Sequence, residues 1–326
     1  DDKAKFDILS DLFVMYRSFK VDTALIVAEE RLQLADRLGE EYVNQGLMNL
    51  ADALNKIGKH EKALEVLDRV KRTEAVRKDT YFYYLYHTTY LSCYNDETEA
   101  SKKRLFMQQI KAYKDTLIAI SDPNTASYVT NKCGRLGLQG KWDEAIRILT
   151  GYYERCTDDD PDKARVEYLL AELYLGKRDV QLAKHYLIRA SITDITNAKK
   201  VYMSLQQLAI LLFQEGDIER AYNYISCSLE DVNFGKARYR IVDIAEYLPI
   251  IKAANDSRVK ADRDRVLFFL LVLSILVITL IIAFFVLRQK NRKLLRVKQS
   301  LAEQNQRLQE MTENLTRMNE EIKESN

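Results

Sequence analysis

The chain has 326 residues, a net charge of +2, and only 10 Gly and 3 Pro. Few Gly and Pro residues are typical of long helices joined by few tight turns, and the near-neutral charge argues against a nucleic-acid-binding surface. The sequence contains no Gly-rich phosphate loop, G-x-S-x-G elbow or H-E-x-x-H motif, and its 3 His are scattered. We therefore expect no enzyme, no catalytic residue, no cofactor and no metal site.

A helix–break–helix pattern recurs along the chain. Within Leu211–Ile225 two apolar helical patterns flank the polar break Glu215-Gly216-Asp217, and a small residue follows the break. The same arrangement places a small residue after the break at Ala24, Ala63, Ala145, Ala183 and Ala221. The steps between them are 39, 82, 38 and 38 residues. The long step predicts one degraded unit, built from helices over 80–94 and 102–117.

Self-similarity at a fixed period is typical of repeat arrays. A Gly at the break accepts the left-handed conformation that ends a helix, and the following Ala lies where the second helix crosses the first. A single hairpin cannot bury its apolar stripe, so the hairpins must stack. The spacing of Leu47, Ala51, Gly58, Ala63 and Leu67 resembles that of the tetratricopeptide repeat (TPR). We expect an all-α, TPR-like solenoid of about six hairpins.

A solenoid of this kind presents the first helix of each hairpin along its concave wall. Counting from the small residues Ala51, Ala171 and Ala209 predicts a polar and aromatic set of groove-facing side chains. These candidate ligand- or partner-binding residues are Asp52, Asn55, Lys56, Arg165, Tyr168, Glu172 and Gln206. The alternative is an ordinary solvated inner wall.

Other side chains are interpreted as packing groups. The four cysteines, Cys93, Cys133, Cys156 and Cys227, have no C-x-x-C spacing, and we expect them to be buried as small apolar side chains. An aromatic cluster at Tyr81–Tyr94 favours packing within the degraded unit over a ligand platform. Since aromatics occupy successive positions there, some of them must face away from the core.

An uncharged stretch of 22 residues, Val266–Leu287, follows the repeats. At ~1.5 Å per residue it spans about 33 Å, enough to cross a ~30 Å hydrocarbon core. Beyond it, leucine or isoleucine recurs every seven residues, at Leu294, Leu301, Leu308, Leu315 and Ile322. Such a seam is typical of a coiled coil and predicts a parallel homodimer. The predicted parts are repeats over 1–255, a linker over 256–265, a membrane helix over 266–287 and a coiled coil over 288–326.

Several segments resemble one family of proteins. Residues 190–200, 211–225, 228–251 and the coil from Leu301 are similar to membrane-spanning regulators of Bacteroidetes, a group related to the starch-utilisation regulator. The resemblance implies periplasmic repeats, a single pass through the inner membrane and a cytoplasmic C-terminus. The flanking charges slightly favour the same orientation, because six Lys or Arg follow the span and five precede it. The resemblance also implies that nucleic acid is contacted only by a domain beyond Asn326.

These features lead to a functional prediction. We expect the sensory and transmembrane part of a transcription-regulating signalling protein, whose repeats bind a periplasmic glycan, peptide or protein. The signal would then pass through the membrane helix and coiled coil. Two alternatives stay open: a membrane-anchored TPR scaffold for partner proteins, and the sensor of a histidine-kinase-type system.

Overall fold

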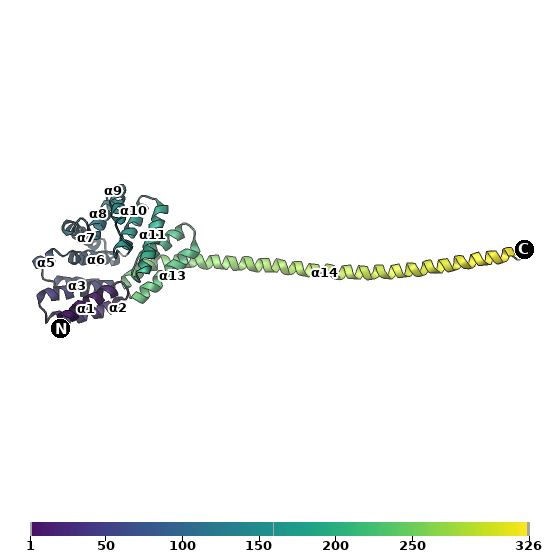
Figure 1. The fold of residues 1–326 in the computed structure, drawn as a ribbon, viewed down its shortest axis with the longest axis horizontal. Helices are drawn as coiled ribbons and strands as arrows, with labels where there is room; N and C mark the ends of the chain where they lie inside the picture. The colour runs from purple at the N-terminus through teal and green to yellow at the C-terminus, as the bar shows by residue number, and fades with distance from the viewer. Residues whose placement is uncertain (1, 159, 325–326) are drawn as a thin grey trace. The chain divides into compact units, whose positions relative to one another are not determined.

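A computed structural model of the chain describes residues 2–158 and 160–324, and within them it contains helices and no strand (Figure 1). The elements are α1 Asp2–Tyr16, α2 Val21–Ala35, α3 Glu40–Lys56, α4 His60–Asp68, α5 Glu74–Arg77, α6 Thr80–Asp96, α7 Ala100–Ile120, α8 Ala126–Leu138, α9 Trp142–Tyr153, α10 Lys163–Gly176, α11 Val180–Thr196, α12 Ser204–Gln214, α13 Ile218–Gly235, the 3-10 helix η1 Arg238–Arg240 and α14 Ile241–Glu324. The predicted all-α class is confirmed.

The helices before η1 pair into successive hairpins, with the short α5 between the second and third. The pairs are α1–α2, α3–α4, α6–α7, α8–α9, α10–α11 and α12–α13. The degraded unit predicted between Ala63 and Ala145 is the α6–α7 hairpin. The five alanines that follow the predicted breaks are all fully buried, as expected for positions where two helix backbones approach closely.

The breaks use the left-handed backbone region. Gly58, Gly140 and Gly216 have φ values of 84°, 74° and 87°. The equivalent residue in the α10–α11 hairpin is Arg178, which adopts a φ of 64° although it carries a side chain. The turn geometry is therefore kept where the glycine is lost.

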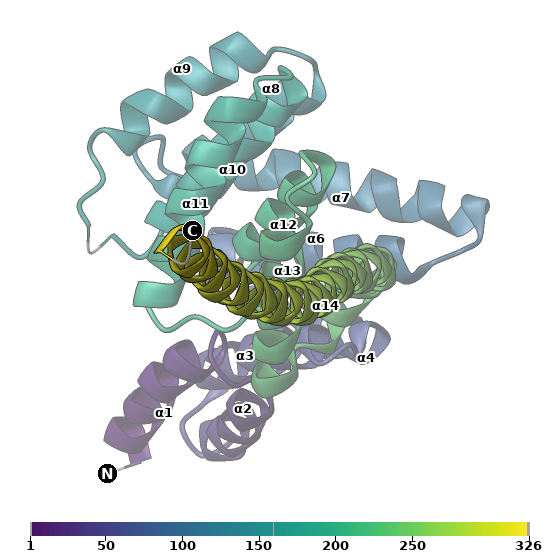
Figure 2. The same cartoon turned by 90° about the vertical axis from the view of Figure 1, so that its right-hand side faces the viewer.

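The first and last hairpins meet, so the repeats close on themselves (Figure 2). The carbonyl of Ser18, in the α1–α2 turn, accepts hydrogen bonds from the backbone N–H of Lys200 at 2.9 Å and of Val201 at 3.2 Å. The rings of Phe19 and Phe234 pack edge to face with centroids 5.3 Å apart. This closure joins segments about two hundred residues apart in sequence.

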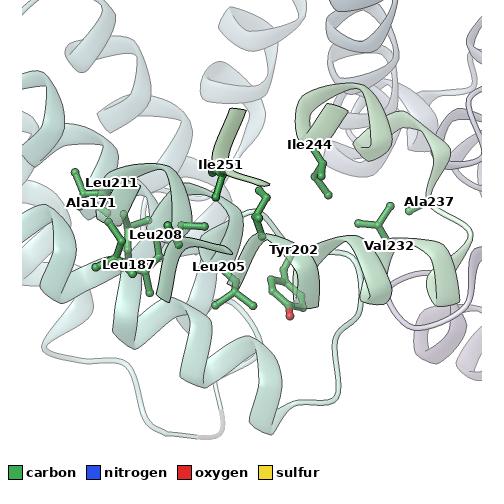
Figure 3. Close-up of a cluster of buried hydrophobic side chains, with 14 of the residues drawn as sticks. Ala171, Leu187, Tyr202, Leu205, Leu208, Leu211, Val232, Ala237, Ile244 and Ile251 are labelled. Atoms are coloured by element: carbon green, nitrogen blue, oxygen red, sulfur yellow. The ribbon is translucent and has the colours of Figure 1, made fainter. Parts of the chain in front are cut away.

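The start of α14 belongs to the packed core of the repeats. Ile244 and Ile251 are both fully buried, in a cluster with Leu205, Leu208 and Val232 of the last hairpin (Figure 3). Their spacing of seven residues places both side chains on one face of the helix. Pro249 lies between them and cannot donate a backbone hydrogen bond to the preceding turn.

The chain separates into two compact units, residues 1–255 and 256–326. The second unit is helical throughout its described part, and α14 contains a stretch long and apolar enough to cross a membrane. The seam residues Leu294, Leu301, Leu308 and Leu315 are exposed in the single chain, whereas the Ile322 side chain lies outside the described ones. Coiled-coil pairing stays a prediction, as do the boundaries of the four predicted parts.

The expectation that all four cysteines are buried was wrong for two of them. Cys93 and Cys133 are buried, Cys156 is half-buried and Cys227 is exposed. Cys227 lies on α13 between the buried Ile225 and Ser228. The helical repeat there turns its thiol away from the packed face.

Candidate ligand-binding site

Two cavities lie along the inner wall of the repeat ring. The first cavity, of about 460 Å³, is lined mainly by α3, α6, α12, η1 and the start of α14. The second cavity, of about 480 Å³, is lined mainly by α6, α8 and α10. Tyr84 and Thr88 of α6 line both, so the cavities are adjacent. The first helices of the hairpins supply most of both walls, as stacking of hairpins requires.

All seven candidate residues line one of these cavities. The first cavity contains Asp52, Asn55, Lys56 and Gln206. The second contains Arg165, Tyr168 and Glu172. The structure thus divides the predicted set into two neighbouring sites, and their role in binding stays a prediction.

Asp52 is the centre of a charged network at the base of the first cavity. Its side chain is 3 % exposed and lies 2.9 Å from the Arg17 guanidinium and 3.8 Å from Nζ of Lys56. The Tyr81 hydroxyl donates a hydrogen bond to the Asp52 carboxylate at 3.0 Å, and Lys56 Nζ donates to the Arg17 carbonyl at 3.0 Å. Three hairpins therefore contribute to one buried carboxylate.

Burial and the ion pairs of this network shift the pKa values of Asp52 and Lys56 in opposite directions. Burial would raise the pKa of Asp52, but the Arg17 and Lys56 cations outweigh it and lower the pKa below its ordinary value. Burial lowers the pKa of Lys56 to about 8, although the Asp52 carboxylate opposes that shift. Arg17 and Arg240 add to the lowering of the Lys56 pKa, because each repels a second cation. The Lys56 ammonium is thus poised to titrate slightly above neutral pH.

The second cavity combines aromatic rings with ionisable groups. Trp142 and Tyr168 line it, and desolvation raises the pKa of Glu172 despite opposing effects of the Tyr168 hydroxyl and Lys114. Burial also lowers the pKa of Lys114. Aromatic faces beside hydrogen-bonding groups suit ligands that combine an apolar face with polar groups, such as sugars or peptides.

The position of Trp142 depends on a glycine. A Cβ placed on Gly176 would lie 2.7 Å from Nε1 of Trp142. A side chain at Gly176 would therefore displace the indole ring. The glycine keeps the only tryptophan of the chain packed against α10.

Counting helical positions from the small residues of the first helices did not predict every residue that lines the cavities. Tyr239, Arg240, Glu246 and Tyr247 line the first cavity but belong to η1 and α14, outside the hairpin pattern. Trp142 begins a second helix, so a search restricted to first helices passes over it. Its being the only tryptophan is the one sequence signal that points to it.

The aromatic cluster of α6 serves mainly for packing, the role that the sequence favoured. Tyr86 stacks on Tyr113 of α7 with centroids 4.7 Å apart, and Phe82 packs against Tyr86 at 5.1 Å. Tyr81 instead bonds Asp52, and Tyr84 faces both cavities. Most of the cluster packs, and one face of the helix turns toward the cavities.

Known protein structures are similar to the chain at low sequence identity. A thermophilic TPR protein of Thermus thermophilus is 18% identical, covering 70% of this chain and 100% of that chain, with a TM-score of 0.45. PilF of Pseudomonas aeruginosa is 15% identical, covering 65% and 90%, with a TM-score of 0.40. A Rap protein complexed with competence and sporulation factor is 12% identical, covering 78% and 86%, with a TM-score of 0.42.

No curated protein sequence matches the chain. A family model, described as the SusR N-terminal TPR domain, matches residues 1–246. That match covers the hairpins, η1 and α14 as far as residue 246. The chain therefore belongs to the SusR N-terminal TPR domain family.

Proposed function

We propose that this chain is the sensory and membrane-spanning part of a protein that regulates transcription. The repeats bind a ligand, and the membrane helix and coiled coil transmit its presence. The observation that carries the proposal is the closed repeat ring with two polar and aromatic cavities on its inner wall. Membership of a regulator family and the apolar stretch of α14 support it.

The proposed orientation places the repeats in the periplasm and the C-terminus in the cytoplasm, with one pass through the inner membrane. The six basic residues between Arg288 and Lys298 support it, since Lys and Arg concentrate on the cytoplasmic side of a membrane span. The exposed seam that begins at Leu294 supports a homodimer through the coiled coil.

The proposed ligand is an oligosaccharide or a short peptide. Both ligand types carry several hydrogen-bonding groups and stack on aromatic rings. Trp142 and Tyr168 supply such rings in the second cavity, and Tyr84 supplies one to both. The volumes of about 460 and 480 Å³ fall within the range of small-molecule sites.

Binding is tested by a thermal-unfolding screen of the full chain in lipid nanodiscs against oligosaccharides and peptides. A ligand at a hundredfold excess over its Kd stabilises the folded state by ~2.7 kcal/mol. One ligand class should raise the unfolding temperature in a concentration-dependent way. No stabilisation by any ligand, together with recovery of a stable protein partner in pull-downs, would instead support the scaffold alternative.

Transmission is tested by deleting residues 294–326. The shortened protein should bind the ligand with unchanged affinity and lose the transcriptional response, measured as transcript levels with and without ligand. A normal response after this deletion would sink the signalling proposal.

A further inference from the structure

The first cavity brings together parts of the chain that are far apart in sequence. Its walls come from the second, third and sixth hairpins and from the segment that leads into the membrane helix. Among the wall residues, Glu246 and Tyr247 lie in the first two turns of α14. A molecule in this cavity therefore touches the repeats and the base of α14 at once.

An unpartnered buried group marks this cavity as a binding site. Gln206 of α12 is 2 % exposed, and its Oε1 has no hydrogen-bond partner among the described residues. Gln206 lines the cavity, and buried amide oxygens are nearly always hydrogen-bonded, so a small turn of this amide toward a cavity occupant would give its buried Oε1 the missing partner. The occupant must offer an O–H or N–H donor to this oxygen.

The charges of the cavity are largely compensated from within the protein. Asp52 lies 2.9 Å from the Arg17 guanidinium and 3.8 Å from Nζ of Lys56. The other charged groups of the lining are of both signs: Asp96, Arg240 and Glu246. The remaining walls offer amides and hydroxyls, including Asn95, Thr88 and Ser92, together with tyrosine rings. An uncharged ligand rich in hydroxyl or amide groups matches this lining better than an ion does.

The start of α14 contains a proline at which the helix can bend. Ile244 and Ile251 hold one face of the helix in the core, while Tyr247 and Glu246 line the cavity. Pro249 lies within this segment and lacks the backbone N–H that would bond the preceding turn. Proline positions of this kind are where helices bend.

We infer that the first cavity binds a small uncharged molecule whose donor group bonds Gln206 Oε1 and whose opposite side contacts Glu246 and Tyr247 of α14. This inference rests on the proposed sensory function and assigns its input to one of the two cavities. A bound ligand can shift the base of α14 to a second position only if it contacts Glu246 and Tyr247 better there than in the position that the structure shows. The signal thus starts at the cavity that the repeats share with the base of α14.

The test uses the full chain in lipid nanodiscs and four uncharged trisaccharides as probes: maltotriose, cellotriose, xylotriose and mannotriose. Calorimetry measures the affinity of the best probe for the wild type and two variants. Gln206→Leu should weaken binding about tenfold, because it removes the acceptor. Arg165→Ala, in the second cavity, should leave the affinity within about twofold and serves as the matched control.

A second readout does not depend on Gln206 variants folding well. In a Trp142→Phe, Tyr247→Trp protein, the new indole reports on the base of α14. Its fluorescence should change on titration with the Kd that calorimetry gives for this same variant. The native Trp142 should report no change, since it lines the other cavity.

The outcomes separate this inference from the proposed function. Wild-type affinity in Gln206→Leu with loss in Arg165→Ala would place the ligand in the second cavity and overturn the inference alone. Binding of peptides but of no trisaccharide would overturn the ligand class and leave the sensory role standing. Absence of binding by trisaccharides and peptides alike would overturn both.

Discussion

At the scale of single residues, the φ angle of one turn residue between paired helices affects the stability of the protein. Arg178 has a φ of 64°, in the region that its three glycine equivalents occupy. A residue with a side chain loses roughly 1–2 kcal/mol in this conformation because its Cβ crowds the following carbonyl. The repeat tolerates that cost because the surrounding hairpin determines the turn.

Arg178→Gly is therefore expected to stabilise the protein. Relief of strain outweighs the extra freedom of glycine in the unfolded chain, leaving a net gain of up to about 1 kcal/mol. Gly140→Ala, at the equivalent turn, should destabilise by about 1 kcal/mol, although its Cβ meets no atom within 4 Å. Urea unfolding measures the free energy of unfolding of both variants. A change of the same sign in both would show that the left-handed turn does not favour glycine.

Loss of the Asp52 carboxylate should destabilise the protein strongly. Asp52→Asn leaves Arg17 and Lys56 without their carboxylate in a buried site, and breaking such a pair costs roughly 3–5 kcal/mol. Glu74→Gln removes an exposed partner of Lys78 that lies 2.7 Å away and should cost under about 1 kcal/mol. Chemical denaturation compares the two, and similar losses would show that the Asp52 network is not structurally important.

Lys56 gives the stability a dependence on pH. Its pKa rises from about 8 in the folded state to 10.5 in the unfolded chain, so between these values the unfolded state binds more protons. Stability relative to Lys56→Met should therefore increase as pH rises through this window, by up to about 3 kcal/mol. Denaturation of both proteins at about pH 7 and about pH 10 measures it, and a constant difference would refute the lowered pKa.

At the scale of elements, the predicted hairpins and the observed helices agree because helix patterns are local. The alanines at 38- and 39-residue steps are all fully buried at helix crossings. The degraded α6–α7 hairpin forms without such an alanine and packs through aromatic rings such as Tyr86 and Tyr113. Its helices were predictable, whereas the division of its tyrosines between core and cavity depended on neighbouring hairpins.

If the helix after the membrane stretch transmits a signal, the response should depend on the heptad register of that helix. Inserting one residue after Lys298 rotates everything beyond it by about 100°, whereas inserting seven residues restores the heptad register. The single insertion should abolish the transcriptional response and the seven-residue insertion should retain it. Ligand affinity measured on both proteins serves as the control. Equal responses from the two would favour a scaffold that transmits nothing.

At the scale of the whole molecule, the repeats are held as a ring by contacts between their ends. Phe19 and Phe234 pack edge to face, and the Ser18 carbonyl accepts two backbone N–H groups from residues 200 and 201. The sixth hairpin, which this closure joins to the first, also supplies part of the wall of the first cavity. Ring closure and ligand binding should therefore support each other.

A double-mutant cycle of Phe19→Ala and Phe234→Ala tests the closure. The two rings should show a coupling energy of about 0.5–1.5 kcal/mol in unfolding experiments, as aromatic pairs do. Ile8→Ala, at a side chain that is 60% exposed, serves as the control paired with Phe234→Ala and should show no coupling. Additive effects of the two Phe variants would mean that the ends do not meet in solution.

The sequence by itself determined the all-α class, the hairpins, the apolar stretch and the helix faces on which Asp52, Tyr168 and Gln206 lie. Those features follow from periodicity within one or two helices, which a pattern of side chains records directly. Only the tertiary structure decided that the ring closes, that the candidate residues divide between two cavities, and that Tyr247 joins the first of them. These depend on the small rotation from each hairpin to the next, accumulated over the array. Residues 18 and 200 meet because these rotations add up along the array, and no local sequence pattern encodes their total.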